Sequence, residues 1–131
     1  MLKKVGLASL AIFITWSVLD FVIHELMLKS SYLSQPQLWR PEAEIKMWLI
    51  SLVVFVSAVC FVYVYVQFIS PKSMNVAVKY GLIFGIGAGM SFAYGTYAVQ
   101  PVHYGIALTW FLGTVIQATI AGVLLGLLVK D

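Results

Sequence analysis

The chain has 131 residues, of which 62% are hydrophobic and only 10% are charged, whereas soluble globular domains carry about 25% charged residues. This composition excludes a soluble domain and makes the lipid bilayer the solvent of the chain. The formal net charge of +3 is not gathered into a basic patch, which argues against nucleic acid as a partner.

Four long apolar stretches fill most of the chain. They cover residues 5–28, 47–69, 76–98 and 105–129. About 20 helical residues cross a bilayer core about 30 Å thick, so each stretch is long enough to span it. We predict an all-α polytopic membrane protein, with residues 1–131 as one domain of four transmembrane helices. Because the last two connections are short, consecutive helices should be antiparallel neighbours in an up-down bundle.

Positive residues are divided unevenly between the two sides of this predicted bundle, and in membrane proteins they accumulate in cytoplasmic loops. Five fall on the side of the termini and three on the other side. They are Lys3, Lys4, Lys72, Lys79 and Lys130 on the first side, and Lys29, Arg40 and Lys46 on the second. We therefore predict that both termini are cytoplasmic (N-in, C-in).

The first span contains a carboxylate, Asp20, toward its outer end. An Asp near the centre of a span costs about 2.5–3.5 kcal/mol on insertion scales. His24 follows one turn later on the same helical face, where its imidazole can hydrogen-bond to that carboxylate. Two interpretations remain open. The pair is either a clamp that docks the first helix into the bundle or a site for a metal, a proton or a ligand.

A metal site would need further ligands, and the predicted outer side contains candidates. His103 lies in the third connection and Glu42 in the first. Together with Asp20 and His24 they offer the nitrogen and oxygen ligands that Zn²⁺ or another divalent first-row ion accepts. A haem held between His24 and His103 is an alternative use of the two imidazoles. No short-spaced ligand motif such as HExxH or CxxC is present.

The first connection is the longest and is expected to lead directly into the second span. Pro41 suits the first position of a helix, and Glu42 and Glu44 would then occupy its first turn, near the positive end of the helix dipole. This predicts a second helix that begins at the membrane surface and continues without a break. Its Val, Phe and Tyr content predicts a mostly lipid-facing helix, with Cys60 as a small packing residue.

Small residues dominate the last two spans and predict a close pair of helices. Two ridges with a spacing of four result: Gly81, Gly85 and Gly89 in the third span, and Ala118, Gly122 and Gly126 in the fourth. Such ridges let two backbones approach closely in lipid, although one of them could instead face another protomer. Gln117, near the middle of the fourth span, is expected to link helices by hydrogen bonding. Tyr94 and Thr96 in the third span are the candidate partners of Gln117 or of Asp20.

Four short strings carry a resemblance to known proteins: LDFVIH (19–24), LWRPE (38–42), KYGLI (79–83) and YGTYAVQP (94–101). In these strings the chain resembles a group of small, uncharacterised four-span membrane proteins of bacteria. The resemblance implies a location in the bacterial inner membrane and supports the helical bundle. It implies no activity and no catalytic residues.

The functional prediction is a non-enzymatic integral membrane protein that works as an oligomer or as an accessory subunit. The chain is too short for a large substrate cavity of its own, and it has no phosphate-binding loop or nucleotide fingerprint. Its polar site near the outer rim, around Asp20 and His24, would bind a divalent cation or a partner. The alternatives are a homo-oligomeric transporter of small solutes or ions, with Asp20 and Gln117 along the path, and a haem-binding redox subunit.

Overall fold

The computed structural model describes residues 2–130, and this part of the chain is all-helical. Four helical stretches are long and apolar enough to cross a membrane. They are Leu2–Met27, Met47–Phe68, Met74–Val99 and Tyr104–Leu128. Each lies within three residues of a predicted span at both ends. The prediction of an all-α chain with four candidate membrane helices is therefore confirmed.

Two of the four stretches change their helical winding along their length. The first consists of α1 (Leu2–Asp20) and a π-helical segment, η1 (Phe21–Met27). The third consists of α4 (Met74–Gly89), the π-helical segment η4 (Met90–Tyr94) and a final α-helix, α5 (Gly95–Val99). The remaining elements are α2 (Lys29–Leu33), the 3-10 turns η2 (Pro36–Leu38) and η3 (Glu42–Glu44), α3 (Met47–Phe68) and α6 (Tyr104–Leu128).

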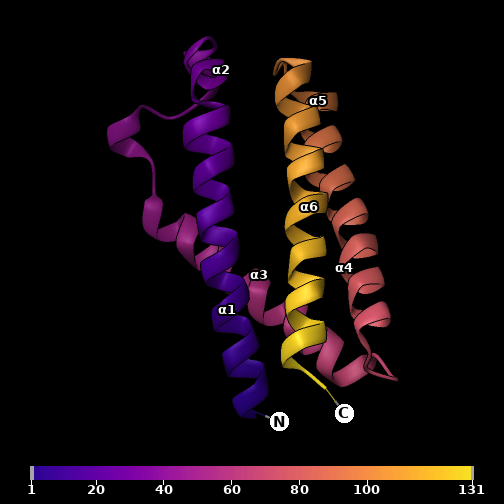
Figure 1. Cartoon of the computed structure of the whole chain (residues 1–131). Coiled ribbons are helices and arrows are strands. Elements are labelled where there is room, and N and C mark those ends of the chain that lie inside the picture. The colour runs from indigo at the N-terminus through magenta and orange to yellow at the C-terminus, as the bar shows by residue number, and fades with distance from the viewer. Residues whose placement is uncertain (1, 131) are drawn as a thin grey trace.

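The helix α6 lies between α1 and α4, and α3 crosses obliquely behind them (Figure 1). Both termini and the turn between α3 and α4 lie at one end of the molecule, which we call the terminal end. There, the Lys4 ammonium donates a hydrogen bond to the Lys130 carbonyl, with 3.1 Å between Nζ and O. The helix α2 and the connection between α5 and α6 lie at the opposite end, called the far end.

The contact between α4 and α6 depends on residues without side chains. A Cβ added to Gly81 would clash with the Ala118 carbonyl oxygen, and one added to Gly122 would lie 2.5 Å from the Ala77 oxygen. At Gly85 an added Cβ would lie 2.9 Å from the Cα of Val115. The two backbones therefore touch directly, which maximises the van der Waals contact that must hold helices together in lipid.

The helix α3 differs from its prediction in where it begins. It does not begin at Pro41. The chain forms only the turn η3, whose i→i+3 bonds rarely continue beyond one turn, and then becomes extended at Ile45 (φ −67°, ψ 129°) before α3 starts. The first half of the helix is exposed, and the second half has both a buried face and exposed residues such as Tyr63 and Phe68. Because α3 crosses α1 obliquely, its second half turns Phe61 and Tyr65 into the core.

Candidate functional site

A hydrogen-bonded cluster joins α1 to α6 inside the apolar part of the bundle. The Gln117 side-chain amide donates to Asp20 Oδ1 over 2.8 Å and also approaches the Trp16 carbonyl oxygen at 3.4 Å. The Trp16 indole N–H returns a bond of 2.8 Å to the Gln117 carbonyl. Trp16 and Asp20 reach the same neighbour because residues four apart lie on one helical face. The carboxylate thus has a hydrogen-bond donor where water is scarce, which offsets part of its cost.

A second cluster lies nearer the far end and joins η1, α2 and α6. His24 Nδ1 and the Tyr32 hydroxyl are 2.6 Å apart, and the indole N–H of Trp110 donates to the same hydroxyl over 2.8 Å. An indole N–H can only donate, so the Tyr32 oxygen accepts from Trp110. Its own proton can then be donated to His24 Nδ1. Trp110 is only 5% exposed, so its N–H depends on this acceptor.

Burial also determines the protonation of Tyr32, which lies outside the membrane-spanning stretches. Loss of hydration raises the pKa of its phenol to about 12, and the negative charges of Asp20 and Glu25 act in the same direction. The hydrogen bond from Trp110 opposes this shift without cancelling it. Because the pKa is far above neutrality, Tyr32 keeps the proton that it can share with His24.

The first and third connections are tied together at the far end by one amide side chain. Gln35 Nε2 donates to the Pro101 carbonyl over 2.8 Å, and the His103 backbone N–H donates to Gln35 Oε1 over 3.0 Å. Gln35 is a buried polar residue, 9% exposed, and both ends of its amide are used. The long first connection is therefore anchored to the start of α6.

Aromatic rings fill the space beneath this anchor. Tyr32 and Trp39 pack edge to face with 5.0 Å between ring centroids, and Trp39 meets Trp110 in the same way at 6.2 Å. Phe92, in η4, stacks on Trp110 at 4.6 Å. We call the three rings of Tyr32, Trp39 and Trp110, together with the Gln35 amide, the aromatic cap. The two π-helical segments, η1 and η4, both contribute residues that contact the cap, and such segments are frequent at functional sites.

The structure gives each residue of the predicted metal site its own surroundings. The hydrogen bonds of Asp20 and His24 lead to Gln117 and Tyr32, whereas the sequence predicted a bond between the two. The side chain of His103 is exposed at the start of α6, and Glu42 is exposed in η3. Among residues 2–130, no three His, Cys, Asp or Glu side chains come together in a way that could hold a metal ion.

Sequence reasoning missed the roles of Tyr32 and Gln35. Both lie in the first connection, where the sequence has no helical periodicity that would assign them a face. The predicted partners of Gln117 also need correction. Its amide bonds to Asp20, which the sequence did not predict as its partner, while the Tyr94 hydroxyl pairs with that of Tyr104 at 3.0 Å.

Comparison with known proteins gives no relative from which to carry over a function. No protein-family model matches the chain, and no curated protein or solved structure matches it either. Since a fold alone does not determine function, only the hydrogen-bonded clusters themselves can indicate one.

Proposed function

We propose that the chain is a non-enzymatic, four-span protein of the bacterial inner membrane, with both termini in the cytoplasm. In this proposal it works as an accessory subunit or oligomer and docks a membrane partner at its outer rim. The observation that carries the proposal is that Asp20 and His24, the polar groups most costly to place in lipid, are bonded to other helices. Their bonds support a fixed far end, which is what a docking surface requires.

The surface offered to the partner runs from the acidic turn η3 onto the first half of α3. Glu42 and Glu44 are exposed in that turn, and the following Trp48 and Leu52 are 66% and 48% exposed. Acidic residues at the rim would orient a partner with basic residues there. The exposed helical surface would pack against a transmembrane helix of the same partner.

Site-specific photo-crosslinking in membranes tests this proposal. A photoreactive residue at position 48 or 52 should give one discrete protein adduct, and the same residue at the exposed position Leu10 of α1 should give none. Replacing both Glu42 and Glu44 with Lys should abolish the adduct, because the charge at the rim is reversed. Equal adducts from all three positions, or an adduct indifferent to the charge reversal, would reject the docking surface.

A divalent-cation site at Asp20 and His24 is the second candidate, and one contact favours it. Metal-binding histidines usually donate their other ring N–H to a neighbouring group. His24 Nδ1, 2.6 Å from the Tyr32 hydroxyl, is placed to do so in the tautomer in which Tyr32 accepts and Nε2 is free for the ion. Titration with Zn²⁺ or Mn²⁺ should then give a weaker affinity for His24→Ala than for the wild type, with His103→Ala as the matched control. Equal affinity in the wild type and His24→Ala would remove His24 from any such site.

A further inference from the structure

The longest uncovered stretch of the chain runs from the first connection into α3. Every residue in the range 40–53 is exposed, whereas no other exposed run in residues 2–130 is longer than five residues (97–101). The stretch includes about two turns of α3, so no neighbouring element covers any face of that part of the helix. Figure 1 shows it on the flank of α1, before α3 crosses behind that helix toward the turn with α4.

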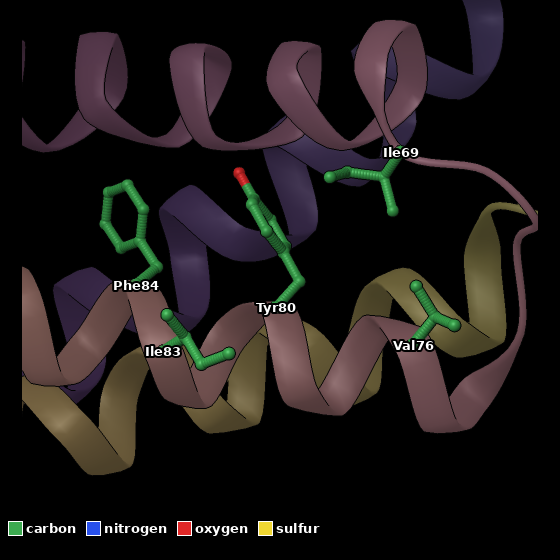
Figure 2. Close-up of a pocket in the computed structure, with 5 residues that line it drawn as sticks. All are labelled: Ile69, Val76, Tyr80, Ile83 and Phe84. Atoms are coloured by element: carbon green, nitrogen blue, oxygen red, sulfur yellow. The ribbon is translucent and has the colours of Figure 1, made fainter.

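Both ends of this stretch are anchored to the bundle. Trp39 precedes it and packs edge to face on Tyr32, with 5.0 Å between ring centroids. Beyond it, the second half of α3 is held by Tyr80 of α4, whose hydroxyl donates to the Phe61 carbonyl over 2.6 Å. Figure 2 shows this hydroxyl directed toward the ribbon of α3. The stretch is therefore held in a defined position, which lowers the entropy lost when a partner binds.

Four charged side chains lie in the first part of the stretch, residues 40–46, which we call the charged segment. Two bases, Arg40 and Lys46, enclose two acids, Glu42 and Glu44, so the segment has no net charge. All four side chains are exposed, and none of them forms an ion pair or a hydrogen bond with another described residue. Because charged side chains that border lipid are costly unless they are paired, this flank favours a partner that supplies opposite charges.

The mixed signs of the charged segment favour a second copy of the chain as that partner. A purely basic partner would attract the two acids but repel Arg40 and Lys46, and a purely acidic one would do the reverse. Copies of one sequence insert in the same orientation, so a two-fold axis along the bilayer normal places their equivalent residues at the same depth. Each contact then occurs twice, and the acids of one protomer can face the bases of the other.

The first half of α3 continues this surface along one ridge. Trp48, Leu52 and Val56 are spaced by four residues and are 66%, 48% and 49% exposed. Ridges with this spacing interdigitate when two helices cross at about −50°. Ile50 lies on the opposite face of the same turns, because two residues rotate a helix by about 200°.

We propose that two copies of the chain form a symmetric dimer through the charged segment and this ridge. The bases of each protomer face the acids of its partner, and the two α3 helices cross along Trp48, Leu52 and Val56. The dimer identifies the partner of the docking surface and therefore rests on the proposed function. It places the charges of the first connection in ion pairs that they do not form within one copy.

Charge exchange between two differently tagged copies, coexpressed in membranes, tests the proposal. A photoreactive residue at position 52 of one copy should give an adduct that carries both tags. Reversing the acids in both copies (Glu42→Lys with Glu44→Lys) should lower this adduct about tenfold, because like charges then face each other. Reversing the bases in both copies (Arg40→Glu with Lys46→Glu) should do the same. Pairing one acid-reversed copy with one base-reversed copy should restore the adduct to at least the wild-type level.

Three controls separate the contact from other effects. Lys29→Glu reverses a charge at the same end but on α2, and it should leave the adduct unchanged. A photoreactive residue at position 50, on the opposite face of α3, should give little adduct with a second copy. Glu42→Gln with Glu44→Gln leaves the number of positive residues unchanged, so it preserves the orientation of the chain. This neutral pair should still lower the adduct from position 52 by about threefold.

The outcomes distinguish this dimer from docking in general. Failure of the mixed pair to restore the adduct, or equal adducts from positions 50 and 52, would overturn the dimer. An unchanged adduct in the neutral pair would overturn it as well. An adduct from position 52 that never carries the second tag would overturn the dimer and leave the proposed docking function intact. The absence of any adduct from position 52 would reject both.

Discussion

Asp20 shows how a charged residue is accommodated inside a span, since its carboxylate accepts a hydrogen bond from the Gln117 amide. We expect Asp20→Asn to change the free energy of unfolding by less than about 1 kcal/mol, because the side-chain oxygen that accepts this bond is retained, and hydrogen bonds between membrane helices average about 0.6 kcal/mol. Thermal or SDS-induced unfolding in detergent micelles measures this change. A gross loss of the folded bundle in Asp20→Asn would show that the charge itself has an essential partner.

Tyr32 has a larger expected effect, because its hydroxyl accepts the hydrogen bond of the buried Trp110 indole N–H. Tyr32→Phe keeps the ring but leaves that donor unsatisfied, which costs about 1–3 kcal/mol. Chemical unfolding followed by tryptophan fluorescence measures the loss. Tyr63→Phe, at a 49% exposed position of α3, is the matched control and should be neutral. Equal stability of the two variants would contradict the role given to the Tyr32 hydroxyl.

The raised pKa of Tyr32 makes a separate prediction about alkaline pH. The folded-state pKa of about 12 lies above the ordinary tyrosine pKa of 10.0, so the folded state holds the phenolic proton more tightly. The resulting stabilisation is complete below pH 10 and is lost as the pH rises toward 12. Between these pH values the wild type should lose more stability than Tyr32→Phe, as measured by unfolding at each pH. Parallel losses in the two proteins would contradict the burial of this phenol.

At the scale of single residues, the sequence identified Asp20, His24 and Gln117 as important because polar side chains stand out in apolar stretches. It could not pair them correctly, since the partner of a side chain depends on how helices rotate and cross. Tyr32 and Gln35 had no such contrast with their surroundings in the first connection. Their roles follow from three-dimensional contacts with α6 and with the connection before it.

At the scale of elements, the glycines of α4 allow a sharp comparison. Gly85 faces α6 closely, whereas a Cβ at Gly87 would meet nothing within 4 Å. We expect Gly85→Leu to destabilise the chain by about 1–3 kcal/mol or more, since overpacking forces the helices apart. Gly87→Leu should be neutral or stabilising, because Gly is a poor helix former. Unfolding of both variants under the same conditions gives the difference, and equal effects would contradict the direct contact of α4 and α6.

The sequence predicted the four long helices well, because span length and hydropathy are properties of a single segment. It failed on the start of α3, where the chain becomes extended at Ile45, and it did not show that the oblique crossing buries one face of the second half. Hydropathy carries no information on the direction in which a helix crosses its neighbours. The sequence did not predict the π-helical segments η1 and η4 either, since they shift the register of a helix without changing its composition.

At the scale of the whole molecule, the remaining question is which end faces the cytoplasm. The terminal end carries Lys3, Lys4, Lys72, Lys79 and Lys130. This asymmetry predicts that the terminal end is cytoplasmic. It also predicts that the exposed Glu42 and His103 lie together on the outer side, because Gln35 ties the two connections that contain them.

Labelling with a membrane-impermeant maleimide tests this arrangement in a Cys60→Ala background, since Cys60 is the only native cysteine. Cysteines introduced at Glu42 and His103 should react in intact spheroplasts. A cysteine at Lys72 should react only after the membrane is permeabilised, because it lies in the turn at the terminal end. The reverse pattern would invert the orientation and leave the bundle intact. Labelling of positions 42 and 103 from opposite sides would contradict the aromatic cap and the proposed docking surface, because both require these connections to share one end of the molecule.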